Sequence, residues 1–78
     1  MKVYHVDVEW DGEAKVWVAA SEDVPGLATG ADTMEELIDR LKSVIPDLLE
    51  ANGMLPEGAT EVPFSIRAER VEHPQRAA

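Results

Sequence analysis

The fold of this chain is set by residues 24–37, VPGLATGADTMEEL, which have the residue pattern of a turn, a short strand and the start of a helix. Pro25 and Gly26 suit the second and third positions of a type II turn. Thr33 and Glu36 have the spacing of a capping box, in which the threonine hydroxyl accepts a hydrogen bond from the glutamate amide. We therefore predict a turn, then a short strand, then a helix that begins directly after Thr33.

The short strand covers residues 27–29 and is closed by Gly30, which can adopt a positive φ that other residues adopt only at a cost. Apolar residues then recur at helical spacing, and Asn52-Gly53 ends the helix. Pro46 lies inside this pattern and predicts a kink, because it removes one backbone hydrogen bond. The apolar stripe of the helix comprises Met34, Leu37, Ile38, Leu41, Val44, Ile45, Leu48 and Leu49.

Three other segments alternate apolar and polar residues with the period of a half-buried strand. Two of them precede the turn and span residues 3–9 and 13–20. The third spans residues 62–71, and Pro63 near its start suits the beginning of a strand or an edge strand. The chain therefore contains four strands, with one helix between the third and the fourth.

The loop between the first two strands determines which side chains share a face. We predict a three-residue loop, residues 10–12, with Gly12 in the left-handed position of a bulge. A two-residue Asp11-Gly12 loop would shift the register and send the apolar residues to opposite faces. The predicted pairs are Val8–Ala14, Val6–Val16 and Tyr4–Val18 on the core face, and Glu9–Glu13, Asp7–Lys15, His5–Trp17 and Val3–Ala19 on the outer face.

These elements predict an α+β domain with the order β-β-β-α-β. Short connections give a mixed four-stranded sheet with strand order 3-2-1-4 and one helix on one face. We assign residues 1–71 to this single domain and residues 72–78 to a flexible tail. The other face of the sheet is uncovered in a single copy.

Composition narrows the function classes. The 78 residues include 16 acids, 7 bases and no cysteine, for a formal charge of −9. A thiolate metal site and a cysteine nucleophile are therefore excluded, and the acid excess disfavours direct binding to nucleic acid. Neither a targeting signal nor a membrane-spanning run occurs, so we expect a cytoplasmic protein that does not bind membranes.

The sequence contains no recognisable catalytic motif. His5, Asp7 and Glu9 share one strand face and could bind a divalent ion, as in a degenerate metal-dependent nuclease. Active sites of that kind need acids from several elements, so we interpret these three residues as a solvated face. We expect a protein that is not an enzyme and has no catalytic residue, metal or cofactor.

The sequence favours association with another protein as the role of this chain. A domain this small gains stability by association, and Trp17 is predicted to lie on the uncovered face. We therefore predict a homo-oligomer, a dimer or tetramer, that uses Val3, His5, Trp17 and Ala19. The alternative is that the C-terminal tail folds over this face.

Acidic residues mark a second candidate surface, suited to a basic protein partner. They are Glu22 and Asp23 before the turn, and Glu35, Asp39, Asp47 and Glu50 on the helix exterior. The alternative interpretation is an ordinary solvated face. For Gly12, Pro25, Gly26, Gly30, Thr33 and Glu36 we predict structural roles only.

Residues 24–37 resemble the N-terminal domain of HicB-type antitoxins, in which a proline-glycine turn, a short strand and a glycine precede Asp-Thr and an acidic helix start. The segments VEWD at residues 8–11 and VWVA at residues 16–19 resemble a family of short, stand-alone HicB-like chains of unknown function. The resemblance covers residues 3–70.

The resemblance implies a truncated ribonuclease-H-like domain that binds a small basic toxin, HicA, which cleaves RNA. Fuller relatives add a C-terminal DNA-binding domain, and this sequence ends after the fourth strand, so no direct DNA binding is expected. The predicted function is a non-enzymatic HicB-like antitoxin or an antitoxin-derived protein-binding module. The alternative is an orphan oligomeric domain of structural or regulatory use without a toxin.

Overall fold

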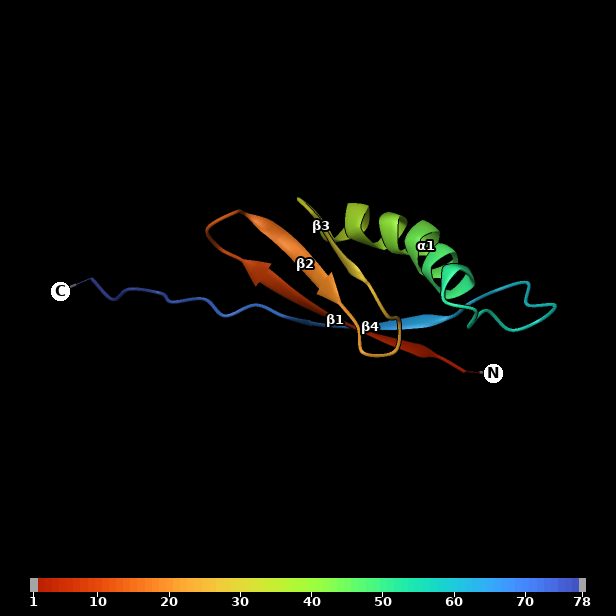
Figure 1. Ribbon diagram of the computed structural model, residues 1–78. Coiled ribbons are helices and arrows are strands. Elements are labelled where there is room, and N and C mark those ends of the chain that lie inside the picture. Colours follow the sequence, from red (N-terminus) through yellow and green to blue (C-terminus); the bar gives the residue numbers. More distant parts are fainter. Residues whose placement is uncertain (1, 78) are drawn as a thin grey trace.

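The computed structural model describes residues 2–77 and has one helix packed on one face of a four-stranded sheet (Figure 1). The strand order is β3-β2-β1-β4, with β1 antiparallel to β2 and parallel to β4. This confirms the predicted α+β class, the order 3-2-1-4 and the single helix. The elements are β1 (Tyr4–Asp11), β2 (Val16–Ala20), β3 (Ala28–Ala31), α1 (Met34–Ala51) and β4 (Phe64–Glu69).

Both predicted ends of the helix are confirmed. The side chain of Thr33 accepts a hydrogen bond from the amide of Glu36 at 3.1 Å. At the other end the Gly53 amide donates to the Glu50 carbonyl at 3.1 Å, and the amide of the next residue donates to Leu49. This is a Schellman motif, which uses the positive φ of the glycine to satisfy the last carbonyls. The helix runs without interruption through Pro46.

The turn before β3 is also as predicted. The Leu27 amide donates to the Val24 carbonyl at 3.2 Å, and Gly26 has a φ of +85°. The prediction that Gly30 closes the third strand was wrong, because this residue lies inside β3 and is not among the glycines with a positive φ. A Cβ at position 30 would instead lie 3.0 Å from the Trp17 carbonyl oxygen, so glycine is needed for close approach of the backbone of β2.

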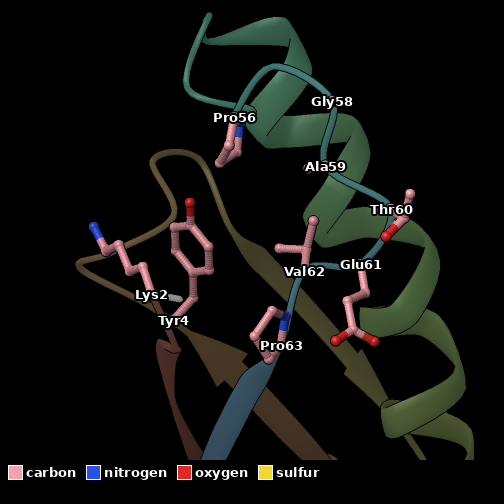
Figure 2. Close-up of a pocket in the computed structure, with 9 residues that line it drawn as sticks. All are labelled: Lys2, Tyr4, Pro56, Gly58, Ala59, Thr60, Glu61, Val62 and Pro63. Carbon is pink, nitrogen blue, oxygen red and sulfur yellow. The ribbon is translucent and has the colours of Figure 1, made fainter.

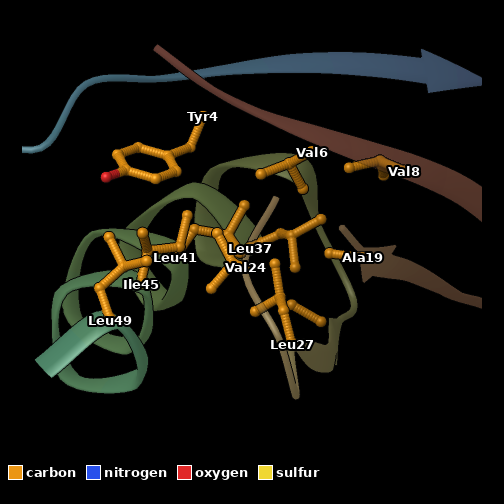
Figure 3. Packing of buried hydrophobic residues seen from close by; sticks show 11 residues of the cluster. Tyr4, Val6, Val8, Ala19, Val24, Leu27, Leu37, Leu41, Ile45 and Leu49 are labelled. Carbon is orange, nitrogen blue, oxygen red and sulfur yellow. The ribbon is translucent and has the colours of Figure 1, made fainter. Parts of the chain in front are cut away.

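The core lies between α1 and the sheet (Figure 3). The helix contributes the buried part of its apolar stripe, and β1 contributes every second residue. The hydrophobic effect of this burial holds the layers together, since no polar or charged side chain is buried in the described part of the chain. The core comprises Tyr4, Val6, Val8, Ala19, Val24, Leu27, Ala31, Leu37, Leu41, Ile45 and Leu49.

The predicted hairpin loop was wrong. β1 continues to Asp11, the loop is residues 12–15, and β2 begins at Val16. Asp11 Oδ1 accepts hydrogen bonds from the amides of the second and third loop residues at 3.0 and 3.1 Å. Lys15, not Gly12, has the left-handed conformation, with a φ of 60°. The side chain of Asp11 therefore stabilises a four-residue loop, in place of the predicted three-residue loop.

This loop changes the register of the whole hairpin. Val8 pairs with Ala19 and Trp10 with Trp17, and none of the predicted pairs forms. Directly opposite residues share a face, so Trp17 and Ala19 face the helix side, while Val16 and Val18 face the outer side. The predicted register was chosen so that valines on the two strands lie opposite each other. The observed register instead brings the two tryptophans together and buries Ala19 beneath α1.

The end of the chain runs away from the domain. β4 ends at Glu69, two residues earlier than predicted, and residues 70–77 have no regular secondary structure. They extend past the hairpin end of the sheet, and every one of them is exposed (Figure 1). This segment, which we call the C-terminal tail, does not fold over the outer face of the sheet.

Candidate binding surfaces

The predicted oligomer interface is split between the two faces of the sheet. Val3 and His5 lie on the outer side, as predicted, because they alternate with the buried Tyr4 and Val6. Trp17 and Ala19 lie on the helix side, and Ala19 is completely buried. The grouping of these four residues was therefore wrong, and the cause is the shifted hairpin register.

The outer face of the sheet is polar over β1 and β4 and has small apolar residues over β2. Asp7 lies opposite Arg67, and His5 lies opposite Ser65, with His5 Nδ1 at 2.8 Å from Ser65 Oγ. This serine–histidine pair is exposed on an open strand surface, where water is not excluded. Residues 2–77 contain no group of three or more His, Cys, Asp or Glu side chains placed to bind a metal ion.

The acidic pair before the turn has a structural task. Asp23 Oδ2 accepts a hydrogen bond from the His5 amide at 2.8 Å, and the Ser21 hydroxyl donates to the His5 carbonyl. These contacts give hydrogen-bond partners to the amide and carbonyl of His5, which lies beyond the end of β2 and has no partner residue on that strand. Glu22 is exposed beside Asp23 and borders a shallow depression with His5 and Asp7. Asp23 therefore has a structural role, and Glu22 is the exposed acid of the pair that a partner could contact.

The four helix acids form a separate surface. Glu35, Asp39, Asp47 and Glu50 are all exposed, and at about 100° per residue they fall within an arc of about 120°. The buried residues of α1 lie on its opposite side, so this arc faces away from the sheet. The structure thus brings these four acids together and places Glu22 and Asp23 elsewhere.

An aromatic cluster that the sequence analysis did not identify lies at the hairpin end of the sheet. The rings of Trp10 and Trp17 meet edge to face, with centroids 5.2 Å apart. The guanidinium of Arg70 lies 4.1 Å from the Trp10 centroid and 5.7 Å from that of Trp17. The two tryptophans flanking the loop were the available signal, but the predicted register placed Trp10 inside the loop.

A cavity of about 380 Å³ lies between the start of β1 and the loop after α1 (Figure 2). The ring of Tyr4 is buried and points toward this loop, and Lys2 Nζ lies 4.9 Å from the ring centroid. The wall is mainly apolar, and its charged members are Lys2 and Glu61. Its lining residues are Lys2, Tyr4, Pro56, Gly58, Ala59, Thr60, Glu61, Val62 and Pro63.

Comparison with known proteins shows the family of this chain. The model of a family described as "Domain of unknown function (DUF1902)" matches residues 3–77. The chain belongs to this family. The match includes the C-terminal tail, so the DUF1902 domain is not limited to the sheet and the helix.

Two relatives of this DUF1902 protein are similar over most of its length. A protein named UPF0150 protein, from Thermotoga maritima, is 36% identical over 52 residues, which are 67% of this chain and 69% of that protein. The crystal structure of a hypothetical protein from the extremely thermophilic bacterium Thermus thermophilus has 47% sequence identity and a TM-score of 0.70. That match covers 96% of this chain and 100% of the other.

Among the described residues of the DUF1902 chain, none lies in a helix with the length and apolar character needed to cross a membrane.

Proposed function

We propose that this protein is a non-enzymatic, HicB-like protein-binding module, and that it binds a small basic HicA-like RNase toxin through the exterior of α1. The resemblance of residues 24–37 to HicB-type antitoxins is one support. These residues form the turn, β3 and the start of α1, which hold the helix on the sheet. They build the scaffold, and the binding surface must be sought in exposed side chains.

The observation that carries the proposal is the arc of acids on α1. Glu35, Asp39, Asp47 and Glu50 are exposed on the side of the helix that faces away from the core. The two cations of α1, Arg40 and Lys42, are exposed just outside the two ends of this arc, so the surface between them has an excess of negative charge. Complementary charge increases the association rate and excludes partners of the same sign. A basic protein therefore fits this surface better than an acidic one.

A non-enzymatic role fits the open position of the only serine–histidine pair found among residues 2–77. Ser65 and His5 lie on adjacent strands of the uncovered sheet face. A nucleophile of this kind needs a third group that orients the base, and donors that stabilise an oxyanion. Arg67 and Asp7 are the charged neighbours, and both are exposed and border a depression of about 460 Å³ together with the serine–histidine pair.

The test uses the product of the reading frame next to the gene for this chain, provided that it encodes a small basic protein with the single histidine expected of a HicA-like RNase. Binding is measured by stopped-flow fluorescence at several salt concentrations. The test variant is Asp39→Lys with Asp47→Lys, and the matched control is Glu13→Lys with Glu57→Lys, which makes the same charge change in two exposed loops.

We expect the helix variant to associate at least about tenfold more slowly and with a weaker salt dependence, and the control to change the rate by less than about threefold. If both variants slowed association equally, the slowing would be caused by the net charge of the protein, and this would contradict a binding site on α1. A neighbouring frame of another kind, or no binding by the unmodified chain, would support the alternative of an orphan oligomeric domain without a toxin.

A further inference from the structure

β4 has an outer edge to which no other strand is paired within residues 2–77. The Tyr4 amide donates to the Pro63 carbonyl at 3.0 Å, and Tyr4 pairs with Phe64 in the parallel ladder. In such a ladder alternate residues direct their backbone groups toward the neighbouring strand. The N–H and C=O groups of Ile66 and Ala68 therefore point away from β1, toward the open edge.

The opposite edge of the sheet is protected. β3 has only four residues, and Arg40 Nη1 donates to the Gly30 carbonyl at 2.7 Å. Short length and a charged side chain on the edge are common ways to prevent strand addition. β4 is longer, with six residues. α1 lies over β2 and β3, so the helix does not protect the open edge of β4.

The C-terminal tail continues the direction of β4 beyond the sheet (Figure 1). Arg70 packs on the tryptophans and bonds Glu72, whereas the residues that follow are exposed on all sides. The family match extends through residue 77, so this segment belongs to the domain although its own copy gives it little to pack on. An extended segment of this kind can pair with a strand of a second molecule.

We propose that two copies of this chain join edge to edge through β4 and the C-terminal tail, antiparallel and with a two-fold axis at Ala68. An interface between identical surfaces closes by such an axis, here perpendicular to the sheet. The two four-stranded sheets become one continuous sheet, and both helices lie on the same face. The proposal does not depend on toxin binding, which uses the exterior of α1.

Charge selects this register among the symmetric ones. With Ala68 on the axis, Arg67 of each copy lies opposite Glu69 of the other, which forms two opposite-charge pairs on the outer face. An axis at position 67 would place arginine against arginine, and one at position 69 glutamate against glutamate. An axis at Ile66 would place Arg67 opposite Ser65, without a charge pair.

The same register gives the tail a partner. Residues 70–73 of one copy lie beside residues 66–63 of the other, so the tail pairs with the first half of the neighbouring β4. The exposed Val71 then lies opposite Ser65, and the half-buried Ile66 gains the aliphatic stem of Arg70 from the other copy. In a single copy the tail extends beyond the sheet, and in the dimer it becomes part of the sheet.

The first test is a charge swap followed by sedimentation equilibrium at micromolar concentrations. The unmodified chain should have twice its mass of 8.6 kDa. Arg67→Glu and Glu69→Arg should each raise the dimer dissociation constant by at least about tenfold, because each creates two like-charge contacts. The double variant should return to within about threefold of the unmodified chain.

The swap is balanced within each copy. Arg67 lies opposite Asp7 and Glu69 opposite Glu9, so one neighbour has the opposite charge and one the same charge both before and after the swap. Recovery in the double variant therefore reports the contact between copies. Single reversals that leave the dissociation constant unchanged, or a double variant as weak as the singles, would overturn the register.

The second test is Ala68→Pro, with Ala68→Ser as the matched control. The proline removes an N–H that points to the open edge, so the ladder to β1 is kept and the variant should unfold cooperatively as a monomer. The serine variant keeps the N–H and should remain a dimer. A monomeric unmodified chain at high micromolar concentration, or a dimer insensitive to the proline, would overturn the proposal.

Discussion

Lys15→Gly is the sharpest test of the hairpin, because it separates the observed loop from the one that the sequence favours. Lys15 has a φ of 60°, a conformation that costs a residue with a Cβ about 1–2 kcal/mol. Glycine removes that cost but loses about 0.5–1 kcal/mol through the larger entropy of its unfolded chain. The net expectation is a gain of about 0.5–1 kcal/mol in the free energy of unfolding.

The companion change is Gly12→Ala. Gly12 is not among the residues with a positive φ, and an added Cβ would meet Trp10 Nε1 at 3.8 Å, which is an ordinary contact. Alanine therefore fits and should stabilise the fold by about 0.4–1 kcal/mol through the unfolded state. In a three-residue loop with a left-handed Gly12, the same change would instead cost about 1–2 kcal/mol.

The assay is thermal and urea unfolding at one fixed protein concentration, since association also contributes to apparent stability. For a domain of this size, about 1 kcal/mol corresponds to a Tm shift of about 4–8 °C. Ala14→Gly is the matched control, because this residue has no positive φ and should lose about 0.5–1 kcal/mol. A lower Tm for both Lys15→Gly and Gly12→Ala would contradict a loop in which Lys15, and not Gly12, is left-handed.

Three further changes test the core, the helix cap and the aromatic cluster. Leu41→Ala should lower the free energy of unfolding by about 2–5 kcal/mol in urea titrations, because the residue is fully buried; a loss below about 1 kcal/mol would contradict its place in the core. Thr33→Ala should cost about 1 kcal/mol and Thr33→Ser much less, since serine keeps the capping oxygen; equal losses would argue against the cap. A double-mutant cycle of Trp10→Ala and Trp17→Ala should give a coupling energy of about 0.5–1.5 kcal/mol, and additive losses would show that the rings do not interact.

The helix acids show how far a candidate site can be predicted from the sequence. Their shared side follows from the helical period alone, and the structure places all four on the exposed arc of α1. Glu22 and Asp23 look equivalent in the sequence, yet Asp23 binds the His5 amide, eighteen positions earlier. No local pattern encodes that contact, because it depends on where β1 extends past the end of β2.

Local sequence is enough to predict the elements whose ends are set by neighbouring residues: the Pro-Gly turn, the capped helix, and the order of strands that short connections allow. The register of β1 against β2, and with it the faces of Trp17 and Ala19, depends instead on tertiary contacts. Every residue of β2 is apolar, so alternation does not distinguish its two faces, and the choice depends on contacts between distant residues. Here the Asp11-capped loop, the tryptophan pair and the burial of Ala19 under α1 together outweigh the simpler pairing of valines.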